Sequence, residues 1–211
     1  MSFVLGLCYF FLKTLKKSKL VIVQARYSSM TIAEYFRKQG AQIGENCDIL
    51  VSSLGPEPYL VRIGNHVFIS EGVVFHTHDG GVWIFREEIP DIRVHGTIVI
   101  EDNCVIGRNA MLLPNIRIGR NSIVGAGSVV ISDVLPNSIV MGVPARVISS
   151  IEKYKERCIA RWKEQKPPDL YIEEGRNWWD SKHSKENKQK VRRHLTNLFR
   201  NQGEAGEEAG K

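Results

Sequence analysis

The sequence predicts a mainly β protein built as a parallel β-helix of hexapeptide type, and three observations lead to that prediction. Read in steps of six, the chain has an aliphatic residue at the first position of every step: Ile100, Ile106, Leu112, Ile118, Val124 and Val130. The fifth position is small or β-branched in each step, and Gly recurs at the second. The same register appears upstream, in IGENCD from Ile43 and in IGNHVFISEGVV from Ile63.

A period of six residues fits neither an α-helix, with about 3.6 residues per turn, nor a strand, whose side chains alternate every two residues. It does fit one short strand followed by one tight corner. The aliphatic residue would point into a narrow prism, and Gly or Asn would take the corner, where a positive φ is easy for these residues. Three such units close one triangular coil, and stacked coils bury a continuous aliphatic column.

The repeat also divides the chain. We expect the β-helix over residues 39–148, interrupted by a loop at 79–96. Residues 1–38 read as a helical, basic arm and residues 149–200 as a helical extension, whereas 201–211 have the composition of a disordered tail. At 211 residues, the chain is long enough for one well-buried domain with such appendages.

The charge distribution and the N-terminus indicate a location. The net charge is +6, and the basic residues concentrate toward both ends of the chain. The apolar run Phe3–Leu12 is shorter than the roughly 20 residues that a membrane-spanning helix needs, and lysines follow it rather than precede it, unlike a secretory signal. We therefore expect a helix that docks on the protein itself or on lipid, in a cytoplasmic protein that contacts the inner face of the membrane peripherally.

Composition argues against two other classes of protein. The cysteines are scattered without a CxxC pair, which excludes a zinc knuckle or a disulfide framework and fits a reducing compartment. Two of them, Cys47 and Cys104, fall at inward or corner positions and read as core packing. The C-terminal stretch combines aromatic and basic residues, but no RNA-binding motif accompanies it, so we predict no nucleic-acid partner.

The repeat breaks in two places, and breaks in a solenoid usually mark loops on the working face. The first, SSLGPEPYLV at residues 52–61, is short and reads as a structural bulge. The second, DGGVWIFREEIPDIRVHG at residues 79–96, is long, and long loops in compact arrays are uncommon unless they are functional. Its aromatic and charged residues favour a lid over a neighbouring subunit's groove or an arm that packs subunits together.

Directly before the long loop, the sequence HTHDGG places two histidines two positions apart. On an extended strand, His76 and His78 share one face and Thr77 points to the other. Such a pair can share a metal ion, but a zinc site needs a third protein ligand, for which His66 and His95 are the candidates. His66 falls at a corner, where Asn or Asp is usual, and reads as a solvent-facing turn residue. We predict no metal site.

The hexapeptide run, with GAGSVV at Gly125–Val130 and GVPARVI at Gly142–Ile148, resembles the left-handed β-helix acyltransferases. That family includes the galactoside, maltose, serine and streptogramin acetyltransferases, and the resemblance covers about residues 40 to 150. It implies a left-handed parallel β-helix with terminal helices, a homotrimer, and a groove between neighbouring prisms for acetyl-coenzyme A and the acceptor. The γ-class carbonic anhydrases share this fold, but their zinc histidines have no counterpart in residues 100–135.

The resemblance also implies which residues act. In the sugar acetyltransferases, a histidine at the start of the extended loop is the general base, and His78 matches that position to within about two residues, with His76 as the alternative. A base suits a sugar hydroxyl, which is a poor nucleophile, and imidazole has an unperturbed pKa of about 6.5. Asp79 or Glu71 would accept the other ring N–H of His78, although Asp79 before two glycines can instead form an Asx turn.

The same resemblance implies contacts with acetyl-coenzyme A. The backbone N–H of Arg108 would face the thioester, and Ala126 would pack on the pantetheine arm. Arg146 would lie near the nucleotide phosphates, with Lys153 as a weaker neighbour. These positions all belong to the later coils or follow them directly.

We therefore expect an acetyl-coenzyme A-dependent O-acetyltransferase that transfers acetyl directly to a hydroxyl of a saccharide, a nucleotide sugar or a surface polysaccharide. Glu71, Trp83 and His95 are the residues expected to contact the acceptor. The sequence leaves open N-acetylation of an amino sugar, acetylation of an antibiotic, and a non-catalytic β-helix scaffold.

Overall fold

A computed structural model describes residues 28–29, 31–172 and 183–208 of the chain. The chain forms two compact units, one ending at Glu152 and one beginning at Lys153, and each is described by itself. The apolar run at Phe3–Leu12, expected to dock on protein or lipid, lies outside the described residues.

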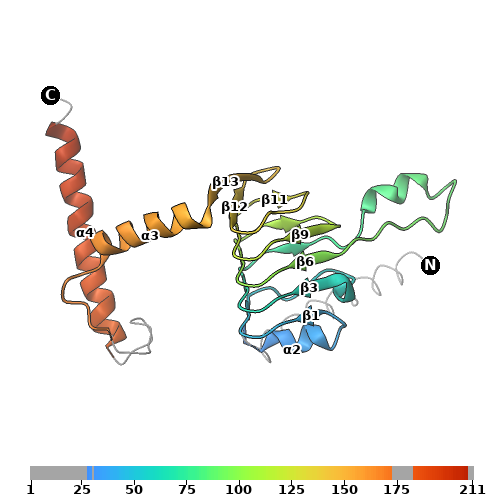
Figure 1. Ribbon diagram of the computed structural model, residues 1–211, viewed down its shortest axis with the longest axis horizontal. Coiled ribbons are helices and arrows are strands. Elements are labelled where there is room, and N and C mark those ends of the chain that lie inside the picture. Colours follow the sequence, from blue (N-terminus) through green and yellow to red (C-terminus); the bar gives the residue numbers. More distant parts are fainter. Residues whose placement is uncertain (1–27, 30, 173–182, 209–211) are drawn as a thin grey trace, which may run out of the picture. The chain divides into compact units, whose positions relative to one another are not determined.

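The first unit is a prism with three strand-lined faces, visible as the stacked arrows of Figure 1. The first sheet contains β1 (Gln42–Ile43), β3 (Val61–Ile63), β6 (Ile98–Ile100) and β9 (Ile116–Ile118). The second contains β2 (Asp48–Ile49), β4 (Phe68–Ile69), β7 (Val105–Ile106), β10 (Ile123–Val124), β12 (Ser138–Met141) and β13 (Arg146–Ser150). The third contains β5 (Val74–Phe75), β8 (Met111–Leu112) and β11 (Val129–Val130).

The pairing of these strands confirms the predicted register. Consecutive coils place the first residues of their repeats opposite one another, as in the pairs Ile63–Ile100 and Ile100–Ile118 of the first sheet. Pairing is parallel throughout the described strands except between β12 and β13, where the chain turns back antiparallel at the end of the prism. The fold is a left-handed parallel β-helix, as the sequence predicts.

The repeat pattern determines which side chains form the core. The six aliphatic residues that start the repeats from Ile100 to Val130 are each at most 1% exposed. The fifth positions are buried too, and where they are polar they find partners: the Ser122 hydroxyl donates to the Leu135 carbonyl at 3.1 Å. Full burial of an aliphatic side chain stabilises a fold by about 1.5–3 kcal/mol, so this column dominates the stability of the prism.

Asparagines line one corner of the prism, between the first and second sheets. Asn103, Asn121 and Asn137 all have positive φ, between 55° and 60°. Their side chains form a ladder, in which Asn103 donates to Asn121 at 2.8 Å and Asn121 donates to Asn137 at 3.0 Å. His66 takes the same conformation one coil earlier, with Nδ1 2.8 Å from Asn103 Oδ1. The prediction that His66 is a turn residue is confirmed.

Glycine is required at the second repeat position for a reason other than the positive φ that the sequence suggests. Gly72 and Gly127, at the fourth repeat position, adopt positive φ at a corner, but Gly107, at the second, is not among the residues with positive φ in the described part of the chain. A Cβ added at Gly107 would lie 2.5 Å from the backbone nitrogen of Ala126 in the next coil. Close approach between coils, rather than φ, therefore requires glycine at this position.

The start of the prism is closed by α2 (Ile32–Arg37), seen at the blue end of Figure 1. Ile32, Ala33 and Phe36 are buried in the same core as the coils. Arg37 fixes the helix by donating to the carbonyls of Ile43 and Gly44. The described part of the expected N-terminal arm thus packs on the first coil.

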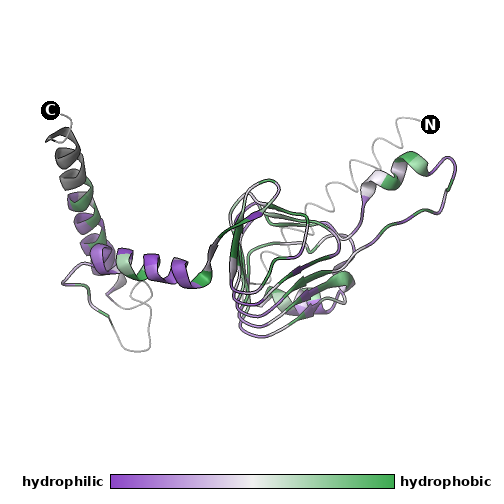
Figure 2. Cartoon of the chain, turned by 45° about the horizontal axis from the view of Figure 1, so that its top comes forward, coloured by the Kyte–Doolittle hydropathy of each residue, from purple (hydrophilic) through white to green (hydrophobic). Residues whose placement is uncertain are grey.

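The second unit contains most of α3 (Ile151–Gln165) and α4 (Ser184–Glu208). Hydrophilic residues dominate α3 (Figure 2). The buried Asn187 connects α4 to the segment after α3, because its side chain accepts a hydrogen bond from the Tyr171 N–H and donates one to the Tyr171 carbonyl. α4 continues to Glu208, past the boundary expected at residue 200. In the described ranges, no helix has the length and apolar character needed to cross a bilayer.

Candidate active site

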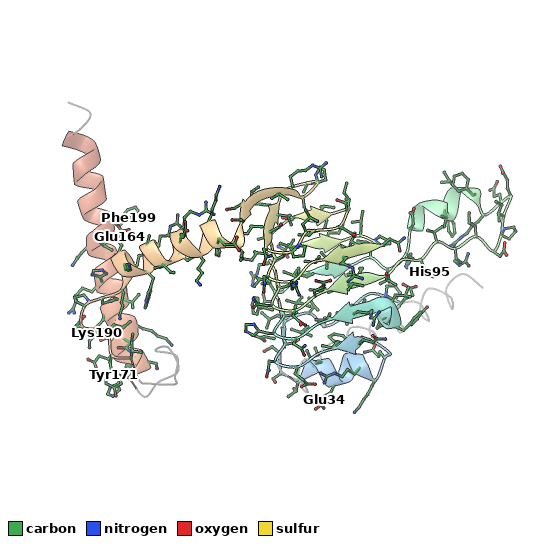
Figure 3. The ribbon with its side chains drawn as sticks, viewed as in Figure 1. Glu34, His95, Glu164, Tyr171, Lys190 and Phe199 are labelled. Atoms are coloured by element: carbon green, nitrogen blue, oxygen red, sulfur yellow. The ribbon has the colours of Figure 1, made fainter. Side chains whose placement is uncertain are left out.

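The long loop leaves and rejoins the prism at one point, where its two ends pair. His78 and His95 form an antiparallel bridge, the Asp79 N–H donates to Val94 at 2.9 Å, and the Gly96 N–H donates to Thr77 at 2.9 Å. Figure 3 shows His95 at the base of the protruding segment. The protruding part of the loop lies between these paired residues, and it begins with a short 3-10 helix, η2 (Gly80–Phe85).

The two histidines alternate with Thr77 as predicted. His76 and His78 are exposed, whereas Thr77 between them is 0% exposed. His66 sits at the corner between the first and second sheets, while His78 follows the third, so His66 does not join the pair. His95 does, with its ring centroid 6.2 Å from that of His78.

Glu57 holds the base of the loop together. Its Oε2 lies 3.0 Å from His78 Nδ1 and accepts the Thr77 hydroxyl at 2.5 Å, while its Oε1 lies 3.9 Å from His95 Nε2. The side chain of Glu57 is 16% exposed. Burial acts to raise the pKa of Glu57, but the hydrogen bonds with His78 and Thr77 outweigh it and leave the pKa below its usual value. The carboxyl group is therefore ionised at neutral pH.

An ionised carboxylate at Nδ1 determines the tautomer of His78. A carboxylate only accepts hydrogen bonds, so Nδ1 must carry the proton, and Nε2 is left with its lone pair. The same negative charge stabilises the imidazolium that forms when Nε2 takes a proton. Glu57 and His78 together form a proton acceptor with a fixed orientation.

Sequence reasoning missed Glu57. It lies in the short break at residues 52–61, which reads as a structural bulge, and it precedes the 3-10 turn η1 (Pro58–Leu60). The only signal was an acidic residue between two prolines, in a break of the period one coil before the histidines.

The two carboxylates expected to orient His78 make contacts with other groups instead. Asp79 Oδ1 accepts the Gly81 N–H at 2.8 Å and caps η2, which is the turn alternative left open by the sequence. Glu71 pairs with Arg108 on the surface. The expectation that Asp79 or Glu71 accepts the His78 ring N–H is corrected, because Glu57 occupies that position.

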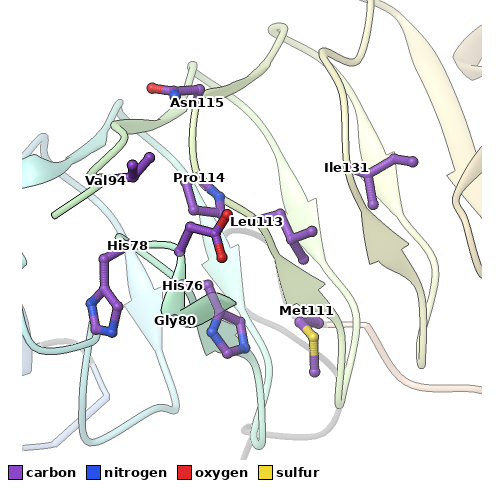
Figure 4. A pocket seen from close by; sticks show the side chains of 10 residues that line it. His76, His78, Gly80, Val94, Met111, Leu113, Pro114, Asn115 and Ile131 are labelled. Carbon is purple, nitrogen blue, oxygen red and sulfur yellow. The ribbon is translucent and has the colours of Figure 1, made fainter. Parts of the chain in front are cut away.

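A groove of about 490 Å³ begins at the histidines and runs over the third sheet (Figure 4). Its polar end contains His76, His78 and Asp79, and its floor is apolar, with Met111, Leu113, Pro114 and Ile131. In Figure 4 the ring of His76 lies beside Met111. Among the described residues, the His76 side chain has no hydrogen-bond partner, in contrast to that of His78.

Three of the four residues expected to contact coenzyme A lie elsewhere on the prism. Arg108 and Ala126 occupy the corner that precedes the third sheet, in successive coils, and the Gly127 N–H donates to the Arg108 carbonyl at 2.8 Å. Arg146 is exposed at the start of β13, beside Ala145, whose N–H donates to Val129. Lys153 begins the second unit. Within the described ranges, none of the four lines the histidine groove.

The remaining sequence candidates have clear positions. Trp83 is 70% exposed on η2, with the Arg86 guanidinium 5.2 Å from its ring centroid. Cys47 and Cys104 are buried, and burial raises the pKa of both thiols, that of Cys104 to about 11. Core packing is confirmed for both cysteines. The described part of the chain contains no group of three or more His, Cys, Asp or Glu side chains suited to a metal ion.

Comparison with known proteins identifies the family. Residues 97–132 match the family model described as bacterial transferase hexapeptide (six repeats). Protein CapG of Staphylococcus aureus is 51% identical over 126 residues, which are 58% of this chain and 73% of CapG. The chain belongs to the hexapeptide-repeat transferase family. Its members are acyltransferases, and the chain is an enzyme of this class.

Two further relatives of this hexapeptide-repeat transferase carry names that specify a reaction. A 2,3,4,5-tetrahydropyridine-2,6-dicarboxylate N-acetyltransferase of Clostridium perfringens (strain SM101 / Type A) is 47% identical over 60 residues, covering 28% of this chain and 25% of that protein. A galactoside O-acetyltransferase of Lactococcus lactis subsp. lactis (strain IL1403) is 36% identical over 92 residues, covering 41% of this chain and 42% of that protein. The chain thus spans less than half the length of these two relatives.

Proposed function

We propose that this hexapeptide-repeat transferase moves an acetyl group from acetyl-coenzyme A to a hydroxyl group of a sugar. The observation that carries the proposal is the Glu57–His78 pair, with Nδ1 3.0 Å from the carboxylate, at the polar end of an otherwise apolar groove. The galactoside O-acetyltransferase relative supports a sugar hydroxyl as the acceptor. Saccharides, nucleotide sugars and surface polysaccharides all belong to this class.

In this proposal His78 is the general base. A sugar hydroxyl attacks a thioester only as its proton leaves, and the free Nε2 of His78 accepts that proton. The acceptor oxygen bonds to the acetyl carbon while the carbon–sulfur bond breaks, and the proton on His78 passes to the departing thiolate. Glu57 stabilises the imidazolium in between and returns to its original hydrogen bond when the proton leaves.

The donor supplies an acetyl group activated as a thioester. The apolar floor of the groove, with Met111, Leu113 and Ile131, fits an extended pantetheine arm, which carries no charge. We propose that Arg108, Ala126, Arg146 and Lys153 contact the donor beyond the groove. We also propose that a homotrimer forms the complete site, with the loop at residues 79–96 next to a neighbouring subunit.

A second candidate is transfer to an amine. The specific observation in its favour is the relative named as an N-acetyltransferase. A neutral amine attacks a thioester without prior loss of a proton, so it depends less on a base than a hydroxyl does. The two candidates therefore differ in how strongly activity depends on His78.

The test measures release of free thiol from acetyl-coenzyme A with a panel of sugars, amino sugars and nucleotide sugars. His78→Asn should abolish transfer to a hydroxyl, and the matched variant His76→Asn should retain most of it because the His76 side chain has no partner that orients it. Transfer to an amine that survives His78→Asn would favour the second candidate. Loss of activity only in His76→Asn would transfer the base role to His76.

The expected location belongs to the same proposal. We propose a cytoplasmic enzyme whose basic N-terminal arm, residues 1–38, contacts the inner face of the membrane peripherally. The measurement is flotation with anionic vesicles at low and high salt, for the full chain and for a variant with Lys13, Lys16 and Lys17 changed to Gln. Salt-insensitive flotation, or flotation of the variant, would contradict an electrostatic contact.

A further inference from the structure

A second, smaller cavity adjoins the histidine groove under the base of the long loop. It has a volume of about 160 Å³ and is lined by Glu57, His78, Asp79, Arg86, Arg93 and His95, among others. His78 and Asp79 line both this cavity and the groove. An acceptor whose hydroxyl lies at His78 therefore has its neighbouring substituents within reach of this cavity.

The two carboxylates of the cavity are already engaged. Glu57 accepts hydrogen bonds from Thr77 and His78, and its second oxygen faces His95 at 3.9 Å. Asp79 accepts the Gly81 N–H as the cap of η2. Neither carboxylate is bonded to an arginine in the described part of the chain.

The two arginines, by contrast, have no carboxylate partner among the described residues. The Nε of Arg86 is buried without a hydrogen-bond partner, and its guanidinium lies over the Trp83 ring. Arg93 donates from Nη1 to the Ile92 carbonyl at 2.8 Å. A buried donor that lacks a partner destabilises the fold, because it has lost its hydrogen bonds to water. The folded protein alone does not replace this lost bond at Arg86.

We infer that this cavity binds an anionic group of the acceptor, a carboxylate or a phosphate, through Arg86 and Arg93. A guanidinium presents its N–H groups as a planar fork that matches the oxygens of either anion, and such charge-assisted bonds are stronger than neutral ones. The inference rests on the proposed function and narrows it. The acceptor is a charged sugar, either a uronic acid or a sugar linked to phosphate.

The size of the cavity limits what enters it. A volume of about 160 Å³ is below the roughly 300–1,000 Å³ of sites that enclose a drug-sized ligand, so it holds a carboxylate or a single phosphoryl group rather than a nucleotide. The sugar ring itself remains in the larger groove beside His76 and His78. The arginines are thus specificity-determining residues, and His78 keeps the proton transfer.

The experiment compares galactose, galacturonate, glucose 1-phosphate and uridine diphosphate glucose as acceptors for wild type, Arg86→Gln, Arg93→Gln and the double variant. Arg62→Gln is the matched control, because Arg62 is an exposed arginine on β3 outside both cavities. Each single change should raise KM for the charged acceptor roughly 10- to 100-fold, by more than it raises KM for uncharged galactose, with a smaller effect on kcat. The acceptor with the larger loss identifies carboxylate or phosphate as the natural anion.

Direct binding separates this inference from the proposed function. Calorimetric titration with galacturonate and glucose 1-phosphate needs no acetyl transfer, so it tests the cavity even if every acceptor fails as a substrate. Arg86→Lys should keep part of the affinity, because lysine retains the positive charge but lacks the planar guanidinium. The melting temperature of this variant should be unchanged. Equal binding by wild type and the double variant, or equal losses for galactose and galacturonate, would overturn the inference.

Discussion

The change of Glu57 to Gln tests the chemistry of the site most directly. The amide has the shape of the carboxylate but no charge, and it can donate as well as accept a hydrogen bond. At 3.0 Å from His78 Nδ1, it would no longer require the proton on that nitrogen. The variant therefore removes both the fixed tautomer and the charge that stabilises the imidazolium, while Thr77 keeps an oxygen acceptor.

The magnitude follows from the contact that is lost. A hydrogen bond to a charged group contributes about 1.5–3 kcal/mol, and each 1.36 kcal/mol corresponds to about tenfold in rate. Because the imidazolium forms only as the proton moves, this loss applies to the transition state. We expect kcat for a hydroxyl acceptor to fall roughly 10- to 150-fold, with little change in KM for the acetyl donor.

The assay is free-thiol release under saturating donor, with Asp79→Asn as the matched control. Asparagine caps a helix about as well as aspartate, so that variant should lose less than about threefold. Nitrogen-15 NMR of labelled histidine should find the proton on Nδ1 of His78 in wild type and a mixture of tautomers in Glu57→Gln. Activity within threefold of wild type, with the proton still on Nδ1, would refute the reasoning.

The same residue predicts how stability depends on pH. The pKa of Glu57 is lowered below its usual 4.5 in the folded chain, so its ionised form stabilises the fold above that pH. This contribution is lost as the pH falls through the lowered value. The difference in unfolding free energy between wild type and Glu57→Gln should thus be present at pH 7 and shrink below about pH 4.5, as measured by urea titration.

Three further predictions concern the prism. Leu112→Ala removes a side chain that is 0% exposed and should cost about 2–5 kcal/mol of unfolding free energy in urea titration. Gly107→Ala places a Cβ 2.5 Å from a backbone nitrogen and should lower the melting temperature by several degrees, whereas Gly80→Ala, with nothing within 4 Å, should not. Cys104, with its pKa of about 11 and its burial, should resist maleimide at pH 8 in the native protein, whereas the exposed Cys158 should react; rapid native labelling of Cys104 would contradict the packing.

The prism could be predicted because the residues of each repeat specify its structure locally. An aliphatic residue every six positions and an asparagine at the corner constrain one strand and one turn, and the next repeat restates the same constraint. The interruption at residues 79–96 could be predicted for the same reason, because the loss of the six-residue pattern can be recognised from neighbouring residues alone. The shared face of His76 and His78 followed from strand alternation alone.

Glu57 could not be predicted in this way because its contact is not periodic. It reaches His78 across 21 positions from a break whose path the repeat does not specify. Asp79 and Glu71 are nearer in sequence, but the two glycines after Asp79 favour the Asx turn in which its oxygen accepts the Gly81 N–H. The repeat shows that position 107 is glycine but not why, because the crowding arises only once neighbouring coils are stacked.

The contacts of Glu57 at the base of the loop make the position of the catalytic base independent of the residues farther out in the loop. Because His78 and His95 are paired where the segment leaves and rejoins the coil, the residues between them can be lengthened, shortened or replaced while the proton acceptor stays in register with the groove. Exchange of residues 80–94 between members of the family should therefore transplant acceptor preference onto an unchanged catalytic base. Diversification by modular replacement is then a property of the architecture itself.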